Sequence, residues 1–155
     1  MLRKKRKLLK SEKGFTLIEL LAVIVILAII AAIAIPAIGS IIKNSRIDAI
    51  KSDATQVLEA AKLYEASNND AGSATNNTTT LSDEQLSSYL DDNDVSKLED
   101  GYSVTVTENS SHKLTYKFNG KGKDGSVEVT FTNATLNDIN SASKGQTSIT
   151  GSTGD

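Results

Sequence analysis

An uncharged run of 23 residues, 20–42, constrains this chain more than any other feature. As an α-helix rising about 1.5 Å per residue it is roughly 34 Å long, enough to cross a bilayer core of about 30 Å. Residues 1–14 ahead of the run carry seven basic side chains and one acid, Glu12. Because positive flanks stay on the cytoplasmic side, the sequence predicts a single-pass membrane helix with its N-terminus inside and the following domain outside.

One carboxylate, Glu19, stands where the basic segment meets the apolar run. An ionised group that enters lipid carries a free-energy cost, so Glu19 calls for a partner. Neither an ordinary anchor nor an ordinary signal peptide needs such a residue. Residues 14–19 read Gly-Phe-Thr-Leu-Ile-Glu. This segment, between a basic leader and a long apolar helix, resembles the signature of the type IV pilin-like family.

The resemblance implies a processing and assembly route. A prepilin peptidase would cut after Gly14, and Phe15, the new first residue, would be N-methylated. An inner-membrane platform protein and an assembly ATPase would then add the subunit to a helical homopolymer. Glu19 would meet the Phe15 amine of a neighbouring subunit, and Pro36 would accompany loosening of the helix during assembly. The implied fold is α+β, the type IV pilin fold, with a long N-terminal helix packed against a three- or four-stranded antiparallel sheet.

Elementary electrostatics supports this arrangement. Cleavage after Gly14 removes a net charge of +6 and leaves one α-amine beside lipid. Phe15 and Glu19 are one helical turn apart, so the amine and the carboxylate can also pair within one chain. A subunit docked out of register would leave two unpaired charges in an apolar core, which costs several kcal/mol. Such pairing would therefore favour the correct axial register.

Composition narrows the function of the remaining residues. Without the leader the chain keeps 10 basic and 18 acidic residues, a net charge of −8, which argues against an intrinsic nucleic-acid surface. The chain contains no cysteine, so disulfides and zinc–thiolate sites are excluded. We expect no cofactor and no metal. The single histidine, His112, is expected in an exposed turn, and the chain is not expected to be an enzyme.

The N-terminus allows two other interpretations. Residues 32–34 and 37–39 resemble small-x-small signal cleavage sites, but the apolar run is longer than the usual 7 to 15 residues of a secretory signal. A plain single-pass anchor is favoured by composition alone. The segment at residues 14–19 reverses that preference.

The long helix is expected to continue past the membrane to about Ser67. Pro36, Gly39 and Ser40 predict a bend or local melting. From residue 43 onward the apolar side chains recur at steps of three and four, which is typical of an amphipathic helix. This apolar stripe consists of Ile47, Ile50, Ala54, Val57, Leu58, Ala61 and Tyr64.

The region after the helix is expected to form one small exposed domain. Residues 68–80 are polar and predict a solvated loop, and Ser82 with Gln85 predicts a capped short helix. Alternating apolar residues around 102–106, 114–118 and 127–131 predict an antiparallel meander, with a turn at 119–125, packed across the stripe. The acids Asp91, Asp92 and Asp94 lack the EF-hand register and are interpreted as a solvated helix end.

The expected organisation runs from a leader (1–14) through a membrane and assembly segment (15–42), an amphipathic half-helix (43–67) and an α/β head (68–132) to a loosely held polar tail (133–155) that could add an edge strand. The expected function is a prepilin of a type IV pilus or similar filament used in adhesion, surface motility or DNA uptake. One alternative is a pseudopilin of a secretion or competence system. Another is a membrane-anchored adhesion or binding module that never polymerises.

Overall fold

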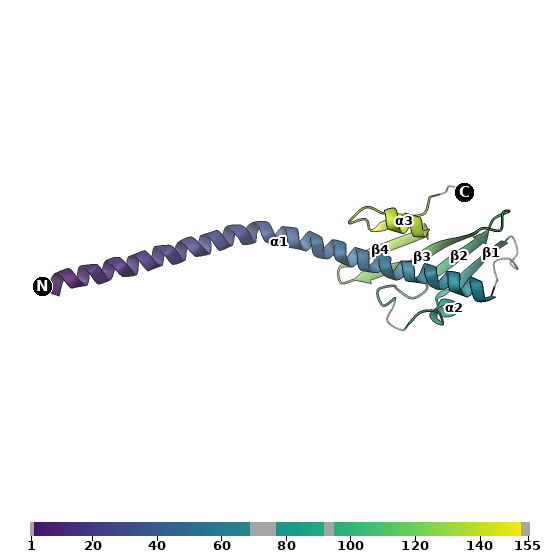
Figure 1. The fold of residues 1–155 in the computed structure, drawn as a ribbon, viewed down its shortest axis with the longest axis horizontal. Coiled ribbons are helices and arrows are strands. Elements are labelled where there is room, and N and C mark those ends of the chain that lie inside the picture. The colour runs from purple at the N-terminus through teal and green to yellow at the C-terminus, as the bar shows by residue number, and fades with distance from the viewer. Residues whose placement is uncertain (1, 69–76, 92–94, 153–155) are drawn as a thin grey trace. The chain divides into compact units, whose positions relative to one another are not determined.

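The computed structural model describes residues 2–68, 77–91 and 95–152, with side chains from Thr16 onward. Its first element is the helix α1, Leu2–Asn68. The elements that follow are β1 (Thr78–Ser82), α2 (Asp83–Ser87), β2 (Ser103–Glu108), β3 (Leu114–Asp124), β4 (Val127–Ala134), α3 (Leu136–Ser141) and β5 (Ser148–Thr150) (Figure 1). The chain divides into two compact units, Met1–Ile42 and Lys43–Asp155. We call the second unit the head.

The α1 helix begins earlier than the sequence predicts, at Leu2 instead of Phe15, and ends one residue later. The earlier start follows from the leader's composition, because Leu, Lys and Arg are good helix formers. Local melting around Pro36 is not observed, since the helix is unbroken from residue 30 to residue 50. Ser40 adds a bond to this region, donating from Oγ to the carbonyl of Ala37 at 2.8 Å.

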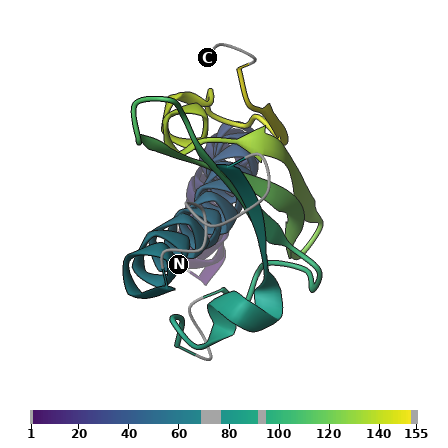
Figure 2. The ribbon, with the colours of Figure 1, turned by 90° about the vertical axis from the view of Figure 1, so that its right-hand side faces the viewer.

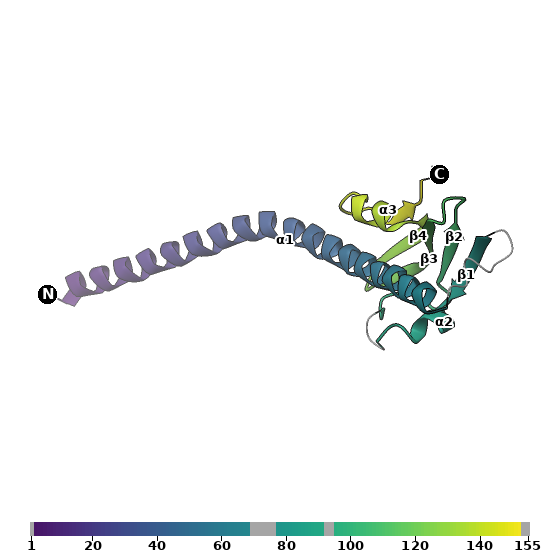
Figure 3. The same ribbon diagram turned by 45° about the vertical axis from the view of Figure 1, so that its right-hand side comes forward.

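The expected α+β architecture is confirmed, but the sheet has five strands instead of three or four. Their order is β1-β2-β3-β4-β5. Each neighbouring pair among the first four strands is antiparallel, whereas β5 runs parallel to β4. The sheet lies along one side of the C-terminal half of α1 (Figure 2). The two short helices lie near its two edges, α2 close to β1 and α3 close to β4 (Figure 3).

The strand β1 lies partly within residues 68–80, where a loop is expected. Its threonines are polar but β-branched, a side-chain shape that suits a pleated strand. They pair with β2 in the register Thr78↔Thr107, and the register brings Leu81 opposite Val104. Leu81 is fully buried. One buried leucine therefore anchors an otherwise polar edge strand, while residues 69–76 of the expected loop lie outside the described residues.

The strand β3 extends through residues 119–124, where the sequence predicts a turn. Its pairing with β4 shifts register between Phe118 and Gly120, and Asn119 bridges the irregularity by accepting the Asn133 amide at 2.8 Å. A Cβ added to Gly122 would lie 2.3 Å from Cγ2 of Ile50 on α1. Gly122 is thus a site of close helix–sheet approach and not a turn residue.

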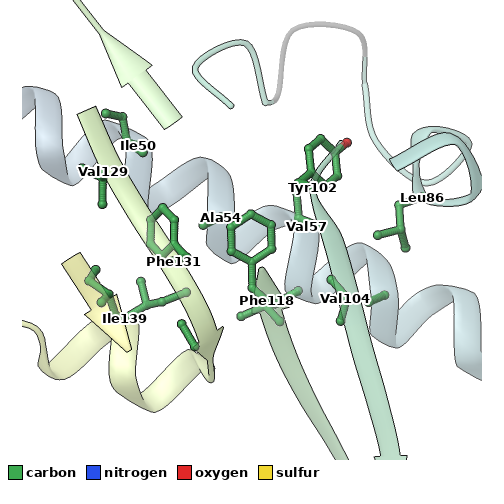
Figure 4. Packing of buried hydrophobic residues seen from close by; sticks show 14 of the residues in the cluster. Ile50, Ala54, Val57, Leu86, Tyr102, Val104, Phe118, Val129, Phe131 and Ile139 are labelled. Carbon is green, nitrogen blue, oxygen red and sulfur yellow. The ribbon is translucent and has the colours of Figure 1, made fainter. Parts of the chain in front are cut away.

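The core of the head is built as expected, from the apolar stripe of α1 and the inner face of the sheet. Ile47, Ile50, Ala54, Val57, Leu58 and Ala61 are fully buried, and Tyr64 packs at the margin. Aromatic rings fill the middle, where Phe118 lies 5.2 Å from Phe131 and 6.1 Å from Tyr102, measured between centroids (Figure 4). The short helix α2 is also as expected, because Gln85 Oε1 accepts the Ser82 amide at 3.0 Å.

Residues 133–152 differ from the loose tail expected over 133–155, although β5 is the additional edge strand that the sequence allows; residues 153–155 lie outside the described residues. Ile139 in α3 and Ile149 in β5 are each only 2% exposed, so this segment contributes to the core. The start of α3 is capped by Thr135, and Asp138 completes a capping box, since its Oδ2 accepts bonds from Thr135 N at 2.9 Å and Oγ1 at 2.6 Å. Ala134, Ile139 and Ile149 join the core that α1 and the sheet create, and Leu136 and Ala142 pack against it.

Candidate processing and assembly site

The candidate site begins at residues 14–19, where the basic N-terminal segment meets the apolar run. The backbone is helical across this whole segment. Phe15 and Glu19 are four positions apart, so their α-carbons are about 6 Å apart along the helix axis. After a cut at Gly14, the Phe15 amine would sit at the positive end of the helix dipole, where a nearby carboxylate is favourable. The side chain of Phe15 lies outside the described residues.

Glu19 is solvent-exposed, as is nearly everything after it up to residue 42. Sixteen large apolar side chains between residues 17 and 42 are between 48% and 72% exposed. They are Leu17, Ile18, Leu20, Leu21, Val23, Ile24, Val25, Ile26, Leu27, Ile29, Ile30, Ile33, Ile35, Ile38, Ile41 and Ile42. Consecutive residues in this set point in all directions around the helix, so the span has no polar face.

Burying the exposed part of these side chains would be strongly favourable. Full burial of one such side chain is worth about 1.5–3 kcal/mol, and here roughly half of each remains to be covered. The total is on the order of 10–25 kcal/mol for the span. Within the described residues, none of the most apolar part of this helix is covered by the rest of the chain. This uncovered apolar surface is of the kind that a lipid bilayer or other apolar helices bury.

Pro36 lies inside this exposed span. Its missing amide leaves the carbonyl four residues earlier, that of Ala32, without its usual helical donor. Gly39 follows one turn later, and a Cβ placed there would meet no atom within 4 Å. No close contact within the single chain therefore requires a glycine at position 39. Small residues on a helix surface do let neighbouring helices approach closely.

Comparison with known families gives one match in this region. The model of the prokaryotic N-terminal methylation motif matches residues 9–35, which contain Gly14, Phe15 and Glu19. The matched segment leads directly into the long helix and the sheet. Motif and fold together fit a type IV pilin-like protein. No curated protein and no solved structure matches the chain.

For a pilin-like protein the motif implies processing by a prepilin peptidase. Within the described residues, the helix Thr16–Asn68 is long and apolar enough to cross a membrane, which is consistent with anchoring before assembly. Gly14, Phe15, Glu19 and Pro36 all lie on the continuous helix α1. The site is therefore a linear one, built by a helix and not by residues that the fold gathers from different strands.

The other residues singled out from the sequence lie apart from this site. His112 lies in the β2–β3 turn with φ 59°, its side chain is 89% exposed, and its Nδ1 faces Glu108 Oε1 at 2.5 Å. Asp91 is exposed, while Asp92 and Asp94 lie outside the described residues. No group of three metal-ligating side chains occurs within the described part of the chain.

Sequence reasoning misses one polar cluster in the head. Alternation identifies Tyr102 only as a core residue of a strand, but in the structure its phenol faces the carboxylates of Asp83 and Asp100. Burial, followed by these two negative charges, raises the pKa of the Tyr102 phenol above its ordinary value of 10.0. The three residues are up to 19 positions apart, so no local pattern could reveal the cluster.

Proposed function

We propose that the chain is the prepilin of a type IV pilus or pilus-like filament. It is cut after Gly14, N-methylated on Phe15, held in the membrane with its head outside, and polymerised through residues 15–42. Its role is structural, and no step of this role requires a catalytic side chain or a cofactor. The observation that carries the proposal is the methylation motif at residues 9–35 on a helix whose most apolar part the rest of the chain leaves uncovered.

The exposed span supports polymerisation over simple anchoring. A plain anchor requires only an apolar surface, whereas Glu19 adds a charge at its start. In lipid this charge is costly, but beside the α-amine of a neighbouring subunit it is neutralised. The pair would form only at one axial offset between copies. Glu19 would thus contribute register, and the apolar side chains would supply the free energy of association.

The head would form the outer surface of the proposed filament. Its own core buries the apolar stripe of the second half of α1. Its outer surface is then free to present polar residues on the outside of the filament. A membrane platform protein and a cytoplasmic ATPase would supply the work of drawing residues 15–42 out of lipid.

Mass spectrometry of the N-terminus tests the processing step. Protein recovered from the native cell should begin at Phe15 and carry one methyl group on its amine. Gly14→Ala should leave the leader attached because the peptidase site is altered. An unmodified Met1 in wild-type protein from cells with an active peptidase would refute the processing step and favour a non-polymerising anchor.

Shearing and electron microscopy test the assembly step. Glu19→Ala should abolish sheared filaments while the protein remains in the membrane fraction. Glu59→Ala is the matched control, because Glu59 lies on the same helix and pairs with Lys62 at the surface. Filaments of normal length and number from Glu19→Ala would show that the carboxylate has no role in assembly.

A further inference from the structure

The head carries an acidic hollow between α2 and the segment that precedes β2. Its volume is about 460 Å³, and three carboxylates and a phenol line it: Asp83, Glu84, Asp100 and Tyr102. No lysine or arginine is among its lining residues. The hollow opens on the α1 side of the sheet, since its wall includes Tyr102 and Leu98, which belong to or pack on the core.

One carboxylate of this hollow is held in place by backbone hydrogen bonds. Asp83 is fixed by two backbone amides, those of Gly101 at 2.7 Å and Glu84 at 2.9 Å. Tyr102 is only 8% exposed, and it lines the hollow beside Asp83 and Asp100. With three carboxylates and no lysine or arginine in its lining, the hollow favours a cationic group from outside.

The opposite face of the same sheet is basic. Because Gly122 faces Ile50 on α1, its neighbours Lys121 and Lys123 project from the other face. Lys117 shares that face two positions before the irregularity at residue 119. Of these three lysines, only Lys121 has an ion pair among the described residues, to Glu128 at 3.8 Å with both side chains about half exposed. Such an exposed pair is weak and leaves the lysines available.

We propose that the acidic hollow of one head receives lysines from the β3 face of a second copy of this chain. This inference rests on the proposed polymerisation and adds a specific contact between heads. The two surfaces are complementary in charge and lie on opposite faces of the sheet, so one head can use both at once. A head-to-tail contact of this type generates an open helical filament when the rotation between copies does not close a ring, as the proposed polymerisation requires.

Cross-linking in a chain that lacks cysteine gives a direct test. Glu84 and Lys123 are exposed and make no side-chain bonds in the described structure, so cysteine at either position should not disturb the fold. Filaments of the full chain carrying Glu84→Cys and Lys123→Cys would be treated with a bifunctional thiol reagent about as long as a lysine side chain. A ladder of dimers, trimers and higher multimers is expected on a denaturing gel.

The two single variants and one control pair test whether the cross-link is specific for the proposed contact. Glu84→Cys alone and Lys123→Cys alone should give no ladder, because each copy then has one half of the contact. Glu84→Cys combined with Lys144→Cys places the second thiol outside the basic face and should also give none. Filaments of the double variant that yield only monomers, or single variants that dimerise equally well, would overturn the proposal.

Charge reversal gives an independent measurement. Glu84→Lys and Lys123→Glu should each lower the yield of sheared filaments several-fold, and the combined variant should restore it. The wild-type contact should also weaken in 1 M salt, where the Debye length falls to about 3 Å. Normal yields from both single variants would contradict the contact while leaving polymerisation through residues 15–42 intact. Absence of filaments from the wild type would instead refute the proposed function itself.

Discussion

Replacement of Gly122 by alanine tests how closely the sheet approaches α1. The new Cβ would lie 2.3 Å from Ile50 Cγ2, 3.0 Å from the Lys97 carbonyl oxygen and 3.1 Å from Leu98 Cδ2. Favourable carbon–carbon contacts lie at about 3.5–4.0 Å, so the methyl group requires a displacement of more than about 1 Å. Ile50 is fully buried and cannot move away freely.

The steric overlap sets the loss of folding stability that we expect for Gly122→Ala. Overpacking of a well-packed core costs about 1–3 kcal/mol, and we expect the upper end because Ile50 is held on a helix. The carbonyl of Lys97 also accepts the Lys123 amide at 2.7 Å, so shifting it would strain a backbone bond. Urea unfolding of the purified full chain in detergent, followed by tyrosine fluorescence, measures the loss.

A double-mutant cycle isolates the contact. Ile50→Ala alone should cost about 2–5 kcal/mol through the cavity that it leaves. In that background the methyl group of Gly122→Ala points into the cavity, so its further cost should fall close to zero. If Gly122→Ala destabilises the head equally in the wild-type and the Ile50→Ala backgrounds, the contact with Ile50 is not the cause. The same conclusion follows if Gly122→Ala has no effect at all.

Three further predictions concern the head. Phe118→Ala should cost about 3–5 kcal/mol because it removes a fully buried ring between two others, and thermal unfolding measures this. Hydrogen bonds from Thr135 hold the pKa of Asp138 below its ordinary 3.8, so the carboxylate stabilises the fold above that pH and loses this effect as pH falls through the lower folded value. Asp138→Asn should thus cost about 1–2 kcal/mol near pH 7 and progressively less in acid, as unfolding at several pH values would show. Lys51→Met should speed amide hydrogen exchange in residues 136–150, because Lys51 Nζ donates to the Ala142 carbonyl at 3.2 Å; unchanged exchange would mean that the bond does not hold this segment.

Patterns with a local cause could be predicted from the sequence. The stripe from Ile47 to Ala61 follows from helical periodicity, and all of its residues are buried as expected. The cap of α2 at Ser82 and Gln85 is equally local. The strand that contains Phe118 follows from the alternation of apolar and polar residues, although the C-terminal end of that strand does not. Glycines at 120 and 122 are common in turns, and only the distances to their neighbours in the fold show that their role is close packing.

Features that depend on a distant partner could not be predicted. The polar strand β1 forms because β2 offers it a ladder and a pocket for Leu81. Residues 133–152 are held because Ile139 and Ile149 meet apolar surface that other elements create. The hollow at Tyr102 likewise needs Asp83 and Asp100 from separate segments.

By itself the sequence determined the linear part of this protein: a basic leader, the methylation motif and a helix apolar on every side. Such features depend only on neighbouring residues along one helix, so position in the chain is sufficient to define them. The tertiary structure alone decided how the head closes, which strands join the sheet, and which charges lie on which face. Those outcomes depend on contacts between segments far apart in the chain, where the free energy of burial outweighs local preference.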